Sequence, residues 1–481
     1  MPPPAPALAE SVRALAEQAF SRAAGAPLLP GNHVQLLKDA RENYPAWLDA
    51  IARATRTIYF ESYIVHDDAS GEQFSDALIA RAADGVRVRV IYDWLGGFGK
   101  TSRKFWNRLR TGGVEVRCYN PPSLASPLGW LSRDHRKVLT VDGRVGYVSG
   151  LCVGQAWVGD PARGIPPWRD TGVEVRGPAV REIEEAFAEM WALMGDPLPH
   201  HRPLGGDVIP TAGETALRVV ATVPNSVGLL RLDQLVAALA RKRLWLTDAY
   251  YAGTPLYVQA LRAAARDGVD IRLLVPSGTD IPLLRPLSRA GYRPLLEAGI
   301  RVFEWNGSML HAKTAVADGR WARVGSTNLN PASWLGNCEM DVIVEDEKFA
   351  SDMEAMYLED LTNATEVILA RDSTVHRRGT HDRTPAAGGG GSAGRAAAGL
   401  LRIGNTVGAA VTNRRTLEPV ECRIMLVSAV VLLIIGVLVA VFPKVAAYPI
   451  AAAALWLAGS LLYRIHRLRR RASREGRLRR E

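Results

Sequence analysis

A short pattern of charged residues occurs twice in this chain, and it restricts the fold more than any other feature. Residues 134–143 read DHRKVLTVDG, and residues 310–319 read LHAKTAVADG. The two copies supply matching side chains 176 positions apart: His135, Lys137 and Asp142 in the first copy, and His311, Lys313 and Asp318 in the second. One such set occurs often by chance, but a repeated set indicates two similar domains that together build one site.

The segments around the pattern repeat as well. Residues 56–65 and 87–94 have the composition of buried strands, and the amphipathic stretch 74–86 between them predicts a helix. The second half repeats this order over residues 243–252 and 257–275. Strand, helix and strand in succession indicate a parallel βαβ unit. We therefore predict an α/β fold of two fused, pseudo-symmetric domains with mixed or parallel sheets flanked by helices.

Composition divides the chain further. A Gly-, Ala- and Arg-rich stretch begins near Arg371 and has little apolar surface to bury, which is typical of a flexible linker. The later part of it, residues 399–422, either lies on a membrane surface or continues the linker. We predict these divisions: an N-terminal extension (1–30), a first half (31–205), a second half (206–370), a linker and juxtamembrane segment (371–422), a hairpin (423–463) and a basic tail (464–481).

Two apolar stretches near the C-terminus predict a transmembrane helical hairpin. Residues 424–442 and 445–463 carry no charge, and each is about long enough to cross the hydrocarbon core of a bilayer. Arginines flank the pair on both sides, which places both termini in the cytoplasm. The N-terminus has no apolar stretch typical of a signal peptide. We expect a membrane-anchored protein whose two α/β domains are cytoplasmic.

The net charge of +10 is concentrated in the tail. Nine arginines and two glutamates lie between Arg464 and Glu481, so this segment carries +7 and the rest of the chain about +3. A protein that binds a nucleic acid usually presents a basic face. The distribution therefore argues against a nucleic-acid partner and favours contact of the tail with the anionic lipids of the inner membrane.

The repeated residues suit chemistry on a phosphodiester. Alternate residues of a strand point to the same face, so His135 and Lys137 are expected to project together, as are His311 and Lys313. If the two halves pack face to face, two imidazoles and two ammonium groups form one cationic pocket. One neutral imidazole can attack phosphorus, and the other, when protonated, can donate to the leaving oxygen.

Other polar residues complete the predicted site. A carboxylate bonded to the far ring nitrogen would fix the tautomer of each imidazole. The candidates are Asp170 and Glu339, each downstream of the histidine in its own half. Ser326 and Asn328 follow the second copy of the pattern and can hold the non-bridging phosphate oxygens together with the lysines.

The aspartates of the pattern and the cysteines have other expected roles. Asp142 and Asp318 each precede a glycine, and Asp-Gly is typical of hairpin turns, so we expect both to be structural. The cysteines contain no CxxC pair, which indicates neither a zinc site nor a disulfide framework. They are Cys118, Cys152, Cys338 and Cys422. We predict no metal and no cofactor.

With its two copies of HxKxxxxD and the GSTN segment, the chain resembles the phospholipase D superfamily over most of residues 31–365, and within it the bacterial cardiolipin synthases. Supporting stretches include DGVRVRVIYDWLGG and WRDTGVEVRGPAV. The resemblance implies a phosphatidyl group held on a histidine and then transferred to an alcohol. It also implies a location at the bacterial inner membrane, with the catalytic domains in the cytoplasm. It assigns the nucleophile to His135 and a role in the site to Lys137, His311, Lys313, Ser326, Asn328 and Glu339.

One departure concerns the first half. Where the superfamily has a glycine pair or Gly-Ser followed by asparagine, this chain reads SGLC, so Cys152 occupies the expected asparagine position. Ser149, at the start of this segment, is the remaining candidate for a phosphate contact in that half.

Three classes of function compete at this point. We expect a membrane-tethered transferase that joins phosphatidylglycerol to a second phospholipid, giving cardiolipin. The alternatives are a hydrolase of the same superfamily, either a phospholipase or a nuclease, and a non-catalytic membrane scaffold. Two intact motifs argue against the scaffold. Sequence leaves open the identities of the donor and acceptor lipids, the choice between transfer and hydrolysis, and the oligomeric state.

Overall fold

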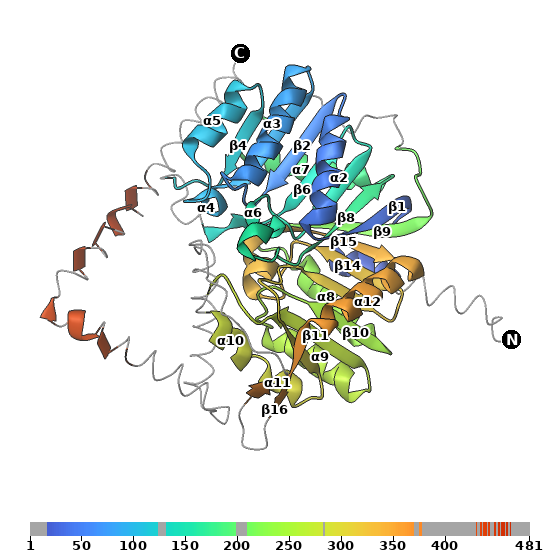
Figure 1. Ribbon diagram of the computed structural model, residues 1–481. Helices are drawn as coiled ribbons and strands as arrows, with labels where there is room; N and C mark the ends of the chain where they lie inside the picture. The colour runs from blue at the N-terminus through green and yellow to red at the C-terminus, as the bar shows by residue number, and fades with distance from the viewer. Residues whose placement is uncertain are drawn as a thin grey trace, which may run out of the picture.

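The computed structural model shows two α/β halves, one above the other in Figure 1, the first coloured blue to teal and the second green to orange. It describes residues 17–123, 131–198, 209–281, 284–369 and 375–377, with isolated positions between Val430 and Leu462. Apart from residues 375–377, the predicted linker and juxtamembrane segment lies outside the described residues, as do the basic tail and most of the predicted hairpin. Among those described, no helix has both the length and the hydropathy needed to cross a membrane.

The first half is a mixed sheet covered by helices. Its main elements are β1 (Leu29–Lys38), α2 (Asp39–Ala52), β2 (Thr57–Ser62), α3 (Ala69–Ala83), β3 (Arg87–Asp93), α4 (Trp94–Gly97), α5 (Arg103–Thr111), β4 (Glu115–Tyr119), β5 (Arg133–Asp134), β6 (Lys137–Val141), β7 (Val145–Ser149), α6 (Gln155–Val158), β8 (Thr171–Arg176) and α7 (Ala179–Leu193). The strands follow the order β4-β3-β2-β6-β7-β8-β1, in which β2, β3 and β4 are parallel and the other neighbours antiparallel.

The second half repeats this arrangement. Its main elements are β9 (Thr215–Thr222), α8 (Gly228–Leu239), β10 (Arg243–Thr247), α9 (Pro255–Arg266), β11 (Asp270–Pro276), α10 (Leu284–Ala290), α11 (Arg293–Leu296), β12 (Arg301–Trp305), β13 (Thr314–Ala317), β14 (Trp321–Gly325), a π-helical turn (Ala332–Gly336), β15 (Asn337–Glu345), α12 (Glu347–Thr362), β16 (Ala364–Leu369) and β17 (Val375–Arg377). The strand order β12-β11-β10-β13-β14-β15-β9 matches the first half, and β16 and β17 extend the β12 edge.

The predicted βαβ units are confirmed in both halves. Strand β2 pairs in parallel with β3, and β10 with β11, with one helix between the two strands of each unit. Helix α3 begins at Ala69, five residues before the predicted start, because the Asp68 carboxylate accepts from the N–H of Gly71 and caps the helix there. Strand β2 ends at Ser62, where the hydroxyl donates to the carbonyl of Ile64 in the following turn.

The two halves share a hydrophobic core. Besides a core of its own in each half, one cluster contains buried side chains from both, including Val148 and Val175 of the first half and Val324 and Val342 of the second. The sheets also meet where β1 pairs antiparallel with β9. The halves are therefore joined along one continuous apolar interface, which fixes the ends of their strands relative to each other.

Both aspartates of the repeated pattern have the structural role predicted for them. Asp142 and Asp318 have positive φ angles of 57° and 52°, as do the glycines that follow them, which is the conformation of a type I′ hairpin turn. The Asp142 carboxylate accepts from the backbone N–H groups of residues 55–57, and Asp318 accepts from those of residues 241–243. Each carboxylate thus ties its hairpin to the start of the neighbouring strand.

We predict that Asp142→Ala lowers the free energy of unfolding by about 2 kcal/mol, because three backbone N–H groups at and just before the start of β2 lose their acceptor. Asp142→Asn, which keeps one amide oxygen and tolerates positive φ, should cost less. The hydrogen bonds lower the pKa of this carboxyl, although burial opposes them. Its contribution is therefore complete above the unfolded pKa of about 4 and is lost as the pH falls. Urea unfolding of the wild-type protein and both variants at pH 7 and pH 3 measures these differences, with the exposed Asp267→Ala as control. Equal unfolding free energies of the wild-type protein and Asp142→Ala at pH 7 would contradict the prediction.

Candidate active site

The two histidines of the repeated pattern lie at the junction of the halves. His135 lies between β5 and β6, and His311 lies just before β13, so neither is within a strand as the sequence had suggested. The reason is a backbone contact across the junction. The N–H of His135 donates to the carbonyl of Cys338 over 2.9 Å. The N–H of His311 donates to the carbonyl of Arg169 over 2.7 Å. Each histidine is thus bonded to the other half.

The carboxylates that orient the imidazoles are exchanged between the halves. Nδ1 of His135 lies 2.9 Å from a carboxylate oxygen of Glu339, in the second half. Nδ1 of His311 lies 2.7 Å from a carboxylate oxygen of Asp170, in the first half. The expectation that each acid serves the histidine of its own half was wrong. The cross-junction backbone bonds explain the exchange, because the acids follow Cys338 and Arg169 directly in sequence.

Other buried groups hold the two carboxylates in place. Glu339 accepts from the hydroxyl of Ser326 (2.6 Å) and from the side-chain amide of Asn337 (3.1 Å). Asp170 accepts from the indole N–H of Trp157 (2.9 Å). These bonds restrict the rotation of both carboxylates, and so they fix the direction in which each imidazole presents its second nitrogen.

A buried ion pair anchors the segment that carries Asp170. The Arg169 guanidinium makes two parallel hydrogen bonds of 2.8 Å with the Asp360 carboxylate of α12. It also contacts Asp39 at 3.2 Å. A bidentate pair has both energy and directional specificity, so α12 of the second half fixes the position of an acid that belongs to the first.

The two lysines lie beside their histidines, as the sequence predicted. Lys137 and Lys313 are both buried. The Lys137 ammonium donates to the backbone carbonyl of His135, and the Lys313 ammonium donates to that of His311. Nζ of Lys313 also lies 3.0 Å from Nδ1 of His311. Two imidazoles, two ammonium groups and two carboxylates therefore lie together at the junction.

Burial and neighbouring charges shift the titration of these groups. Burial lowers the pKa of His311 to about 3, and the Lys313 ammonium adds to this effect. Burial likewise lowers the pKa of Lys313 to about 8. Burial alone would raise the pKa of Asp170, but His311 and Lys313 bring it down to about 2. Burial raises the pKa of Glu339. At neutral pH, His311 is therefore neutral and donates its Nδ1 hydrogen to an ionised Asp170.

Aromatic rings surround the imidazoles and were not predicted as site residues. Tyr63 meets the His135 ring edge-on at 5.0 Å, and Tyr250 meets the His311 ring edge-on at 6.0 Å. Trp157 lies 5.5 Å from His311. The signal for the tyrosines was present in the repeat, since each follows its strand at the same place, in ESYIV and DAYYA. Trp157 could not be found in this way, because no tryptophan lies 176 residues after it in the second half.

The predicted phosphate-binding residues have different surroundings. Asn328 has a buried amide oxygen for which no hydrogen-bond partner occurs among the described residues, whereas Ser326 is bonded to Glu339. Ser149 accepts from the N–H of Leu151 within its own loop. By the 176-residue offset its counterpart is Gly325, and Gly150 is the counterpart of Ser326. The phosphate contact of Ser149 remains a prediction.

Gly150 and Cys152 explain why the first half lacks the GSTN side chains. A Cβ on Gly150 would lie 2.2 Å from a carboxylate oxygen of Asp170, so the acid of His311 occupies the space that a serine would need. Cys152 is buried, and its carbonyl accepts from the hydroxyl of Tyr44 (2.6 Å). The two halves therefore contribute unequally to the pocket wall.

The chemistry available is acid-base and nucleophilic catalysis on an anion. Within the described parts of the chain, no group of three or more His, Cys, Asp and Glu side chains is placed to hold a metal ion. The imidazoles, with Nδ1 bonded to a carboxylate, present Nε2 for reaction. The lysines supply positive charge in a buried setting, where electrostatic stabilisation of a phosphoryl group is strongest.

Comparison with known proteins identifies the family. The family model described as "Cardiolipin synthase, PLD-like domain" matches residues 47–191 and 236–361. Cardiolipin synthase A of Pseudomonas aeruginosa is 36% identical over 357 residues, which cover 73% of this chain and 71% of the relative. The cardiolipin synthase of Alkalihalophilus pseudofirmus is 30% identical, with coverages of 71% and 68%. The crystal structure of phosphatidylserine synthase from Haemophilus influenzae has a TM-score of 0.58 at 14% identity over 73% of this chain and 91% of that chain, which shows the fold alone.

We predict that activity falls as the pH rises through about 8, because Lys313 then loses the charge that stabilises the phosphoryl oxygens. The measurement is kcat/KM on a short-chain phosphodiester lipid between pH 6 and 10. Any residual activity of Lys313→Arg should lack this alkaline limb, since a guanidinium does not titrate in the range. A wild-type profile that stays flat to pH 10 would contradict the assignment.

Proposed function

The chain belongs to the cardiolipin synthase family of phospholipase D-like enzymes, and on that basis we propose that it is a phosphatidyl transferase that forms cardiolipin from phosphatidylglycerol and a second phospholipid. The observation that carries the proposal is the junction site, where two carboxylate-bound imidazoles lie beside two buried lysines. Such a site suits a double displacement at phosphorus, with one imidazole as nucleophile and the other as acid and base.

In the first step, Nε2 of His135 attacks the phosphorus of the donor lipid. The bond between phosphorus and the headgroup oxygen breaks, and His311 protonates that oxygen as it leaves. His311 is neutral in the empty site. The negative charge of a bound phosphodiester raises the pKa of this imidazole, so the acid forms once the donor is in place. The product of this step is a phosphatidyl group on His135 and a free headgroup alcohol.

In the second step, the hydroxyl group of an acceptor lipid replaces the histidine. The acceptor gives its proton to His311, its oxygen bonds to phosphorus, and the bond from phosphorus to His135 breaks. Both imidazoles return to their starting state. Glu339 stabilises the positive charge on His135 during both steps, and Asp170 does the same for His311. Lys137 and Lys313 neutralise the charge on the non-bridging oxygens. The side-chain amide of Asn328 donates a hydrogen bond to one of them.

We further propose that the C-terminal region tethers the enzyme to the cytoplasmic membrane with both termini in the cytoplasm. The two uncharged 19-residue stretches at 424–442 and 445–463 fit a helical hairpin, and the arginines on both sides fit a cytoplasmic location for each end. A tether confines the search for two lipid substrates to one surface and raises their effective concentration. A soluble substrate would gain much less from such an arrangement.

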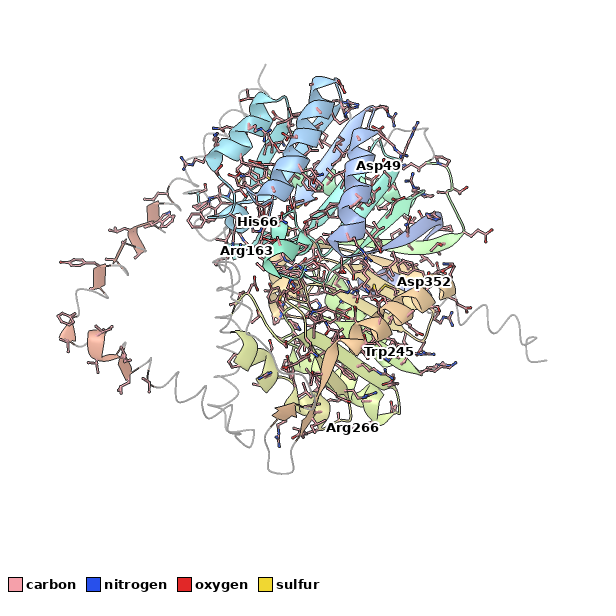
Figure 2. The ribbon with its side chains drawn as sticks, viewed as in Figure 1. Asp49, His66, Arg163, Trp245, Arg266 and Asp352 are labelled. Atoms are coloured by element: carbon pink, nitrogen blue, oxygen red, sulfur yellow. The ribbon has the colours of Figure 1, made fainter. Side chains whose placement is uncertain are left out.

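Exposed apolar side chains beside the site support contact with a bilayer. Phe98 is 62% exposed after β3, and Val158 and Leu256 are exposed on the segments that follow β7 and β10. All three lie at the strand ends nearest the histidines. Figure 2 shows the exposed Arg163 at the end of the first half that faces the second. Apolar and basic side chains together suit an anionic lipid surface, and a site against the bilayer excludes the water that would compete with the acceptor.

We predict that His135→Ala and His311→Ala each lower kcat at least about 10³-fold, and that the double variant is little worse, because the two imidazoles act as one unit. The exposed His33→Ala on β1 is the matched control and should retain activity. When the His311→Ala variant reacts with labelled donor and the reaction is stopped without acid, the label should be found on His135. A label on His311 in the His135→Ala variant, together with no label on His135 in the His311→Ala variant, would reverse the two roles.

Purified protein with labelled phosphatidylglycerol in vesicles is expected to give a dimeric phospholipid and glycerol, also in the presence of EDTA, since the imidazoles supply the chemistry. His135→Ala protein is the blank. Phosphatidic acid as the sole labelled product would identify a hydrolase. Loss of activity in EDTA that a divalent ion restores would refute the two-histidine mechanism.

A further inference from the structure

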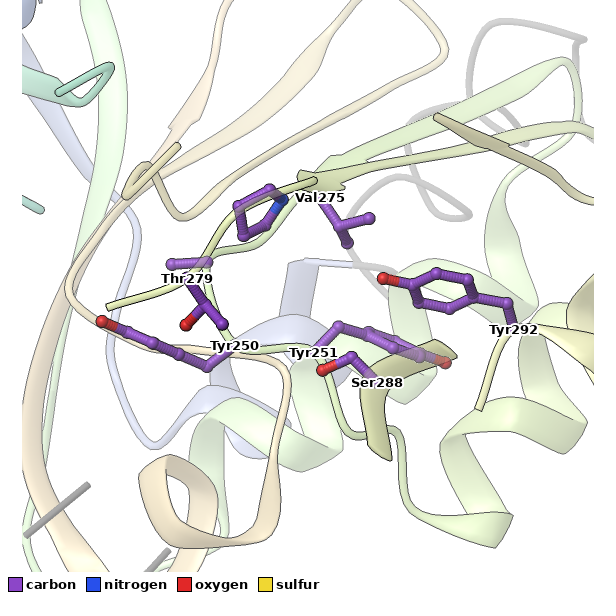
Figure 3. Close-up of a pocket in the computed structure, with 8 residues that line it drawn as sticks. Tyr250, Tyr251, Val275, Thr279, Ser288 and Tyr292 are labelled. Carbon is purple, nitrogen blue, oxygen red and sulfur yellow. The ribbon is translucent and has the colours of Figure 1, made fainter. Parts of the chain in front are cut away.

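A small cavity in the second half lies next to Tyr250, whose ring contacts that of His311. It is bounded by the segments that follow β10 and β11 and by α10. The residues that line it are Ala249, Tyr250, Tyr251, Val275, Pro276, Thr279, Ser288 and Tyr292, shown in Figure 3. The space is much smaller than that of a typical small-molecule site, so it suits a single hydroxyl group of a ligand and not an acyl chain.

The lining is neutral and rich in hydroxyl groups. Tyrosine, threonine and serine side chains face the space, and none of the described lining residues is charged. The hydroxyl of Tyr251 is buried and has no hydrogen-bond partner among the described residues. A buried hydroxyl without a hydrogen bond lowers the stability of the protein unless a ligand or a water molecule supplies that bond. The cavity is thus suited to a hydroxyl group of a neutral ligand and not to a phosphate.

Tyr250 connects the cavity to the reacting histidine. Its ring lines the cavity and meets the His311 ring edge-on at 6.0 Å. Its hydroxyl donates to the carboxylate of Asp280 over 2.9 Å, which fixes the ring between the two spaces. In the transfer step, His311 removes the proton from the incoming hydroxyl. The acceptor must therefore approach from the side of His311, which is where this cavity lies.

The first half is filled at the equivalent place. Strands β3 and β11 match at an offset of 183 residues, so Gly96 corresponds to Thr279. Gly96 belongs to α4, and a Cβ there would lie 2.9 Å from the ring of Tyr63 and 2.1 Å from its carbonyl oxygen. Helix α4 thus packs directly against Tyr63, the counterpart of Tyr250. The two halves are therefore packed differently at this place, since Thr279 lines the cavity in the second half.

We propose that the cavity binds one hydroxyl of the glycerol headgroup of the acceptor lipid and so directs the other hydroxyl to the phosphorus held on His135. The inference rests on the proposed transferase function and adds the location of its acceptor. In the step, the acceptor O–H bond breaks and its proton passes to His311, while the new oxygen–phosphorus bond replaces the bond to His135. The unpaired Tyr251 hydroxyl bonds the acceptor glycerol.

The first test uses Tyr251→Phe and two soluble acceptors, glycerol and 1-propanol, with labelled short-chain phosphatidylglycerol as donor. Wild-type enzyme should prefer glycerol, and the variant should lose about 3- to 10-fold of that preference, the effect of one hydrogen bond. Its unfolding midpoint should not fall, because no bond within the protein is removed. An unchanged glycerol-to-propanol ratio would overturn the proposal.

The second test fills the cavity with Ser288→Leu, and Ser351→Leu on the exposed face of α12 is the matched control. With labelled phosphatidylglycerol in vesicles, the cavity variant should lower the ratio of dimeric phospholipid to phosphatidic acid. The same product ratio in both variants would contradict an acceptor site here. Wild-type enzyme that forms phosphatidic acid alone would instead refute the transferase function itself, so the two failures are distinguishable.

Discussion

Two hydrogen bonds that cross between the halves determine whether this protein has an active site. His135 is oriented by Glu339, and His311 by Asp170, so each imidazole depends on an acid from the other half. Neither half contains a complete unit. The shared core, the β1–β9 pairing and the ion pair between Arg169 and α12 keep these distances near 2.8 Å. Duplication of the domain is therefore the physical condition for catalysis, because one copy supplies a histidine without its acid.

Burying so many charged groups is unfavourable unless they compensate one another. Lys313 and Asp170 are both fully buried, and their mutual attraction offsets part of the cost of leaving water. The surplus positive charge of the lysines is available to an anion. A phosphodiester thus enters a site whose charges are already oriented, which is more effective than having solvent reorganise during the reaction. The lowered pKa values of His311 and Lys313 are consequences of this burial.

Much of the fold could be read from the sequence because it is repeated. The βαβ units, the hairpin turns at Asp142 and Asp318, and the proximity of each lysine to its histidine all follow from local patterns. The exchange of Asp170 and Glu339 could not be read, since order along the chain does not reveal which half a strand end faces. The cavity near Tyr251 was also beyond the sequence, because it depends on how α10 and α4 differ in packing. The role of Ser149 in phosphate binding stays a prediction.

The most direct test of the exchanged carboxylates is the ¹⁵N spectrum of the imidazoles in the full-length protein. His311 and His135 can be assigned with the two alanine variants. Asp170→Asn is expected to shift the Nδ1 signal of His311 and leave that of His135 in place, and Glu339→Gln is expected to do the reverse. If Asp170→Asn instead shifts His135, each acid serves its own half, and the site is not built across the junction.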